Sequence, residues 1–147
     1  MRLSAKGRYA LASTISMAEN QSNEYITLIS ISEKLGISKI YLEQVFSLLK
    51  HGGIVTSIKG SQGGYQLAKP SKKITVYDIL SAVETSLFES AEETVKEKSP
   101  EIETAMNLLI YDSLDASIKT ALQKITLYEL VAEAEKHRSN QSFMFFI

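Results

Sequence analysis

Apolar residues between positions 28 and 51 recur at three- and four-residue spacing, which is typical of two short helices. Ile31 and Leu35 lie on one face of the first helix. Gly36 follows at once, where a tight turn needs a residue that tolerates φ > 0. Ser38 can then cap the second helix, because its hydroxyl can accept a free backbone N–H. The buried face of that second helix is predicted to hold Leu42, Val45 and Leu49.

Residues 54–67 change to the pattern of a two-stranded hairpin. Ile54–Lys59 is β-prone, Gly60–Gly64 is a glycine-rich turn, and Tyr65–Leu67 is the return strand. A glycine-rich turn can also cradle phosphate, but this one lacks the Gly-Lys-Ser/Thr ending of a P-loop and opens no helix. The fold class predicted is therefore mainly α: a winged helix-turn-helix with a two-stranded wing, a unit that usually places a helix in a DNA major groove.

Further helices are predicted on both sides of this unit. Apolar periodicity indicates one from Ser4 to Asn20. Two later segments, Ile74–Leu80 and Ile125–Val131, each place a threonine three residues before an acid, which is a capping box. Helices should therefore start at Thr75 and Thr126.

A long helix is predicted from Ser99 to about Lys124, because Ser is a fair N-cap and Pro100 fits the first turn. Its apolar stripe is wider than a small winged helix needs for its own core. We expect a second subunit to cover it, since two-fold dimers match palindromic half-sites; burial within one chain is the alternative. The predicted dimerisation residues are Ile102, Met106, Leu109, Ile110, Leu114 and Ile118.

The chain is predicted to divide into three parts: residues 1–80 as the DNA-binding domain, 81–137 as dimerisation helices, and 138–147 as a C-terminal tail. The start of the tail, 138–142, is polar and is expected to act as a tether. An exposed apolar end would risk aggregation, so the fold, the other subunit or a partner should cover it. The residues of this predicted partner-binding segment are Phe143, Met144, Phe145, Phe146 and Ile147.

Composition narrows the function classes. The 147 residues are 44% hydrophobic and include no cysteine, which rules out disulfides and thiolate metal sites. His51 and His137 lack metal-ligand spacing, so neither metal nor cofactor is predicted. No signal peptide or membrane-spanning run is recognised, so a cytoplasmic protein without membrane contact is expected. No paired carboxylates or nucleophile–base arrangement indicates an enzyme.

The net charge of −1 hides an asymmetry. Residues 1–73 contain ten basic and four acidic residues, a balance of +6, which leaves −7 for residues 74–147. A basic half suggests a polyanionic partner such as double-stranded DNA. Chance segregation on a solvated surface is the alternative.

The predicted DNA contacts follow from side-chain chemistry. Gln44 suits adenine edges, Glu43 can accept from cytosine, and Lys39 is expected to hold phosphate. Basic residues at the start of the first helix oppose its macrodipole, which phosphate contact would explain; for Arg8 a structural ion pair is the alternative. The full set is Arg2, Lys6, Arg8, Ser38, Lys39, Tyr41, Glu43 and Gln44, with Lys59, Ser61 and Gln62 of the wing.

Three motifs together resemble the IscR-like winged-helix regulators, also called the Rrf-two family. They are the opening MRLSAKGRYA of residues 1–10, Tyr41–Gln44, and Lys59–Leu67. The likeness covers essentially the whole chain and implies a homodimeric transcription factor with a long helix making the dimer. Many relatives hold an iron–sulfur cluster through three cysteines after the wing. This chain has none there, so no cluster is expected.

Within that family the chain resembles the cysteine-free CymR-type repressors of cysteine metabolism, which share its Met-Phe-aromatic-Ile ending. The resemblance implies a repressor controlled by complex formation with cysteine synthase, which recognises C-terminal isoleucine tails. There are two departures: Lys59 stands where the family usually has Arg, and residues 82–100 do not match closely.

Other interpretations stay open at this point. The chain could respond directly to a small molecule, or act as a winged-helix protein–protein adaptor without DNA. The tail could pack on the dimer as a closing strand. Operator sequence, regulated genes, effector and assembly beyond a dimer are not given by the sequence.

Overall fold

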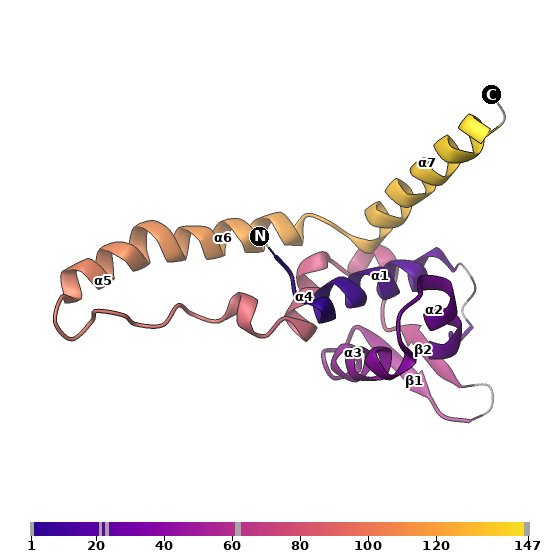
Figure 1. The fold of residues 1–147 in the computed structure, drawn as a ribbon, viewed down its shortest axis with the longest axis horizontal. Coiled ribbons are helices and arrows are strands. Elements are labelled where there is room, and N and C mark those ends of the chain that lie inside the picture. The colour runs from indigo at the N-terminus through magenta and orange to yellow at the C-terminus, as the bar shows by residue number, and fades with distance from the viewer. Residues whose placement is uncertain (1, 21, 23, 61–62, 146–147) are drawn as a thin grey trace.

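The computed structural model describes residues 2–20, 22, 24–60 and 63–145, and the side chains of these up to residue 141. The mainly helical fold with a two-stranded wing is confirmed. Figure 1 shows a helical body, a long arm to one side, and a last helix leaving in another direction. The elements of the body are α1 (Ala5–Glu19), α2 (Leu28–Leu35), α3 (Lys39–His51), β1 (Val55–Ile58), β2 (Gly64–Leu67), η1 (Ser71–Lys73) and α4 (Val76–Val83). After η2 (Ser86–Phe88) come α5 (Pro100–Met106), the π-helical η3 (Asn107–Tyr111), α6 (Asp112–Gln123) and α7 (Leu127–Phe145).

The helix-turn-helix forms for the local reasons that its sequence indicates. Gly36 ends α2 at φ 69°, a conformation that glycine adopts without a Cβ penalty. Ser38 caps α3 by accepting a hydrogen bond from the Tyr41 backbone N–H. Ser32 donates to the Ile37 carbonyl at 2.5 Å and closes the turn between the two helices. The predicted inner face of α3 is confirmed, because Leu42, Val45 and Leu49 are fully buried.

The wing is an antiparallel hairpin tied to the helices at its base. Val55 pairs with Leu67 and Ile58 with Gly64, and Gly60 turns the chain at φ 119°. Tyr65 packs its ring edge-on against Phe46 of α3 with centroids 4.9 Å apart, and it exchanges two backbone hydrogen bonds with Ile26. The base of the wing is therefore fixed relative to α3. Ser61 and Gln62 lie outside the described residues.

A buried carboxylate joins the two ends of the body. Glu84, which is 7% exposed, accepts hydrogen bonds from the backbone N–H and the hydroxyl of Ser4. A Cβ on Gly7 would overlap the Glu84 carboxylate, so only glycine lets α1 approach α4 this closely. Two residues of the opening motif are thus explained by one long-range contact.

The starts of α4 and α7 lie side by side. The capping box predicted at Thr75 is confirmed in both of its halves, and Thr126 accepts from the Glu129 backbone N–H at 3.2 Å. Two reciprocal backbone bonds join the segments: the Val76 N–H donates to the Ile125 carbonyl, and the Leu127 N–H donates to the Ile74 carbonyl. The arm from η2 to α6 therefore leaves and rejoins the body at almost the same place.

The predicted polar tether is wrong, because α7 continues through residues 138–142 as far as Phe145. No glycine or proline interrupts the sequence after Thr126. Arg138 also bonds Glu135 one turn back at 2.7 Å, a contact that favours the helix. The proposed boundary at residue 138 falls inside α7, and Phe143, Met144 and Phe145 are helical rather than a closing strand. Phe146 and Ile147 lie outside the described residues.

Candidate nucleic-acid interface

The outer face of α3 is exposed and mainly polar, as predicted for a helix that reads DNA. Ser38, Lys39, Glu43 and Gln44 are all exposed to solvent. Lys39 and Glu43 form an ion pair at 3.6 Å with both side chains about half exposed. At that exposure the pair contributes little to folding, so both groups stay available to a ligand.

Tyr41 does not share that outer face. It is half-buried, and its ring packs at 87° against Tyr9 of α1 with centroids 5.0 Å apart. The expectation that Tyr41 faces outward is therefore wrong for its ring, because α1 lies against that side of α3. The contact instead places the basic start of α1 beside the first turn of α3.

The basic residues at the start of α1 form no ion pair with an acidic side chain in the part of the chain that the structure describes. Arg2, Lys6 and Arg8 are exposed, and none of them forms an ion pair there. The alternative for Arg8, a structural ion pair, is therefore not observed. Their charges are available to an anionic partner on the side where α1 meets α3.

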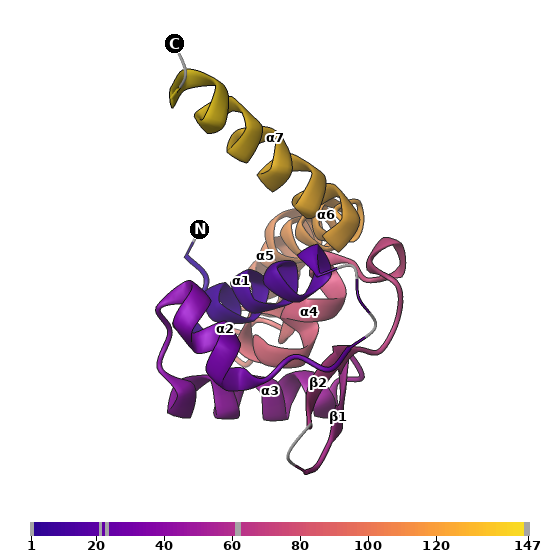
Figure 2. The same ribbon diagram turned by 90° about the vertical axis from the view of Figure 1, so that its right-hand side faces the viewer.

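A groove of about 660 Å³ lies between the start of α2, the outer side of α3 and the wing. Its lining includes Lys39 and Glu43 of α3 and Lys59, which follows β1. All three were predicted from the sequence as DNA contacts. Lys50 also lines it and was not predicted. Lys50 follows Lys39 by eleven residues, about three helical turns, and this spacing was the signal that could have found it. Figure 2 shows the wing projecting beyond the body next to one end of α3.

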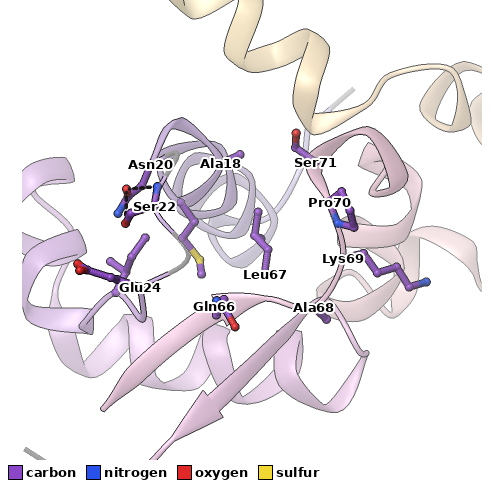
Figure 3. A pocket seen from close by; sticks show the side chains of 12 residues that line it. Ala18, Asn20, Ser22, Glu24, Gln66, Leu67, Ala68, Lys69, Pro70 and Ser71 are labelled. Carbon is purple, nitrogen blue, oxygen red and sulfur yellow. Dashed lines mark hydrogen bonds between the residues drawn. The ribbon is translucent and has the colours of Figure 1, made fainter. Parts of the chain in front are cut away.

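A second cavity, of about 570 Å³, lies at the base of the wing between the end of α1, β2 and the linker to η1 (Figure 3). Leu67 lies near its middle, while the charged ends of Glu24 and Lys69 extend to opposite sides, away from Leu67. The cavity lacks convergent charges, and it lies in the basic half of the chain rather than the acidic half. It therefore gives no support to effector binding in the acidic half.

The arm carries the predicted dimerisation residues on an uncovered face. Leu109 is 79% exposed, and Ile102, Ile110 and Leu114 are each about half exposed. Met106 and Ile118 are half-buried. Leu108, which was not predicted, is also exposed at 63%. Leu108 lies within the π-helical turn, where successive side chains are rotated by a smaller angle than in an α-helix.

A second buried carboxylate organises the loop before the arm helix. Glu103 is 3% exposed and accepts from two successive backbone N–H groups, Thr94 at 2.9 Å and Val95 at 3.1 Å. Paired amides of this kind satisfy a buried carboxylate without a metal or a cation. No sequence pattern indicates this contact, because the partners are backbone atoms of an irregular loop.

The end of α1 is linked to both α2 and α7 through Glu19. Its carboxylate lies 2.6 Å from Arg138 of α7 and 3.7 Å from Lys34 of α2. The hydrogen bond from Arg138 to Glu19, together with the charge of that carboxylate, raises the pKa of Arg138. One acidic side chain thus connects the last helix with the helix-turn-helix.

The α3 face, the wing and the basic flank define a winged-helix DNA-binding regulator. The chain belongs to the Rrf2 (Rrf-two) family, described as iron-dependent transcriptional regulators, whose model matches residues 3–133. The transcriptional regulator IscR of Erwinia tasmaniensis is 37% identical over 135 residues, 92% of this chain and 81% of that protein.

Solved structures of regulators are similar over nearly the whole chain. CymR, the global cysteine regulator of B. subtilis, is 32% identical with a TM-score of 0.72, covering 90% of this chain and 98% of that one. IscR of T. potens is 30% identical with a TM-score of 0.70, covering 93% and 90%. These relatives are regulators and not enzymes.

The donor groups of this chain do not fit the iron that the family description implies. The sequence has no cysteine, so it offers no thiolate. Within the described ranges, no group of three or more His, Asp or Glu side chains is placed to hold a metal ion. His137 pairs with Glu133 at 3.0 Å on α7, and His51 is the last residue of α3.

No described helix is long and apolar enough to cross a membrane.

Proposed function

We propose that the chain is a homodimeric repressor that binds operator DNA through α3 and the wing, works without an iron–sulfur cluster, and controls cysteine metabolism through a protein partner. One observation carries the DNA-binding part. The exposed face of α3, the lysine-lined groove beside the wing, and the basic residues at the start of the chain, which form no ion pair with the other described residues, all lie around the same helix. Two such units, related by two-fold symmetry, would meet the two halves of a palindromic site.

The contacts divide into two kinds. Glu43 and Gln44 can read base edges, since a carboxylate accepts from cytosine and an amide pairs with adenine. Lys39, Lys50 and Lys59 line the groove where phosphates would pass, and Arg2, Lys6 and Arg8 extend the positive charge along α1. Ser38 can donate its hydroxyl proton to DNA while its oxygen caps α3. Ser61 and Gln62 belong to the same proposal as contacts of the wing tip.

The exposed apolar side chains of the arm support the proposal that the chain forms a dimer. Its large apolar side chains are exposed in the single chain, and such a face is stable in water only when it is covered. A second arm offers the matching apolar surface, and an isologous contact closes after two subunits. We assign Ile102, Met106, Leu109, Ile110, Leu114 and Ile118 to this seam.

Function without a cluster is supported by the donor set and by the loop before α5. No thiolate is present to bind iron–sulfur, and the Glu103 carboxylate already holds that loop through two amides. The loop is therefore ordered by the chain itself. The regulatory signal must then enter elsewhere.

The proposed entry point is the end of α7. The similarity to B. subtilis CymR supports a role in cysteine metabolism, and the apolar end of this chain supports capture by a partner. Cysteine synthase is the partner that the resemblance implies, with Phe143 to Ile147 as the segment it would bind. O-acetylserine would compete for the same cleft, so the complex would dissociate as that metabolite rises. A helical α7 presents this segment on a rigid stem instead of a loose tether.

A DNA-binding assay with Gln44→Ala tests the first half of the proposal. Removing the amide should weaken operator binding by about 1–3 kcal/mol and relax preference at one base pair of each half-site. Gln123→Ala removes the same amide group from an exposed site on α6, away from α3, and is the control. Equal weakening on every sequence would refute base reading by Gln44.

A binding assay with cysteine synthase from the same organism tests the second half. The intact chain should bind the enzyme, O-acetylserine should dissociate the complex, and deletion of Ile147 should abolish binding while the dimer and its DNA affinity persist. Retained synthase binding after the deletion would refute the tail as the docking segment. If O-acetylserine changes DNA binding with no synthase present, direct small-molecule control is the correct mechanism.

A further inference from the structure

Ile40 is an apolar side chain in the first turn of α3, and it is 71% exposed. Among the large hydrophobic residues described in the body, none is more exposed. Single exposed apolar residues are common on protein surfaces, so exposure alone gives this residue no role. Its position on the helix is the reason to assign it a role.

Successive residues of an α-helix are rotated by about 100°, so positions seven apart return to nearly the same line. Ile40 and Ser47 lie on such a line, directly opposite the buried residues Leu42, Val45 and Leu49. Glu43 and Gln44 follow Ile40 by three and four positions and therefore flank it on the outer face. Ile40 thus lies at the centre of the surface that α3 presents, away from the core.

The surroundings of Ile40 are polar. Lys39 is paired with Glu43, Ser38 caps the helix, and the neighbouring aromatic ring of Tyr41 is turned aside against Tyr9. No apolar partner for Ile40 is therefore supplied by α3's own outer face. In the major groove of DNA the apolar group at a base edge is the C5-methyl of thymine.

We infer that Ile40 is a specificity-determining residue that contacts the C5-methyl group of one thymine in each half-site. The contact favours a T·A pair over a C·G pair beside the base pairs met by Glu43 and Gln44. This inference rests on the proposed docking of α3 in the major groove. It adds a residue that neither charge nor hydrogen-bonding capacity would select.

The test removes only the methyl group. The full-length protein first selects its own sites from random double-stranded DNA, and each thymine of the selected site is then replaced in turn by deoxyuridine. At one thymine per half-site, the replacement should weaken binding of the unaltered protein roughly three- to fivefold, the effect expected for one buried carbon group. Ile40→Ala should bind thymine and deoxyuridine at that position equally well.

Two variants serve as controls. Ile40→Val keeps a branched side chain at the same position and should retain part of the methyl effect. Ile125→Ala removes a side chain that is 36% exposed between α6 and α7, outside the groove, and should retain all of it. Both replaced side chains are exposed, so the variants should fold as the unaltered chain does.

Each failure has a distinct meaning. If no single deoxyuridine weakens binding, or if the methyl effect is as large in Ile40→Ala, the role of Ile40 is refuted while DNA binding by α3 stands. If no sequence is enriched, or if Gln44→Ala leaves every base preference unchanged, docking by α3 is refuted and the role of Ile40 falls with it.

Discussion

The body and the arm treat their apolar side chains in opposite ways. In the body, Ile31, Leu42, Phe46, Ile79 and Leu80 are at most 2% exposed. In the arm, the apolar residues from Ile102 to Leu114 that face outward are about half exposed or more. The body has its own core, whereas the arm is complete only when another surface covers it. Stability of the body and association through the arm should therefore be separable by mutation.

The largest effect is expected at the arm. Leu109→Asp would place an unpaired charge in the proposed seam, at a cost of roughly 3–5 kcal/mol to association. Sedimentation equilibrium should show monomers, while circular dichroism keeps the helical signal of the body. Thr104→Asp adds the same charge at an exposed site two positions from both Ile102 and Met106, on the opposite face of α5, and should leave the dimer intact. A stable dimer carrying Leu109→Asp would remove Leu109 from the seam.

A smaller effect is expected in the body. Gly7→Ala would push a methyl group into the Glu84 carboxylate and should lower the free energy of unfolding by about 1–3 kcal/mol. Urea denaturation measures this, and the dimer should persist at low denaturant. In a Glu84→Ala background the added cost of Gly7→Ala should shrink, because the obstructing carboxylate is gone. An undiminished cost there would show that the contact with Glu84 is not the cause.

The smallest effect should appear on the DNA-facing side of the body. Lys50→Ala with Lys59→Ala would remove two of the lysines that line the groove. Each lost phosphate contact should reduce the salt dependence of log K by about 0.9 without changing base preference. Lys98→Ala with Lys124→Ala removes the same charge from exposed sites outside the body and is the control. If the salt dependence is unchanged when Lys50 and Lys59 are both replaced, the groove does not contact phosphate.

Local chemistry made the body predictable from its sequence. Gly36, Ser38 and Thr75 each act through neighbours only a few residues away, so spacing alone revealed the turn and the caps. Glu84 and Glu103 were missed because their partners come from elsewhere in the chain: the backbone N–H and hydroxyl of Ser4 for the first, and two loop amides for the second. A buried glutamate is unusual, and sequence position does not reveal burial.

Two other differences have the same origin. Tyr41 was expected to face DNA because its helix position is near the outer side, but α1 supplies an aromatic partner, Tyr9, that attracts the ring. The polar composition of residues 138–142 suggested a tether, yet they contain no glycine or proline to end the helix, and α7 continues through them. Helix position in the first case and composition in the second indicate solvent exposure, but neither reports tertiary contacts or backbone conformation.

The way in which α7 is attached makes it a lever. Its fulcrum is the reciprocal backbone pairing of Ile74 with Leu127 and of Val76 with Ile125, and Lys72 lies over the Tyr128 ring 4.6 Å from its centre. The 19 residues of α7 span about 28 Å, so a tilt of roughly 10° at the fulcrum carries the far end about 5 Å. Farther along, Arg138 is fastened to Glu19, whose carboxylate also lies near Lys34 of α2. A tilt of α7 would therefore move Arg138, and with it the Glu19 carboxylate that lies between α7 and α2.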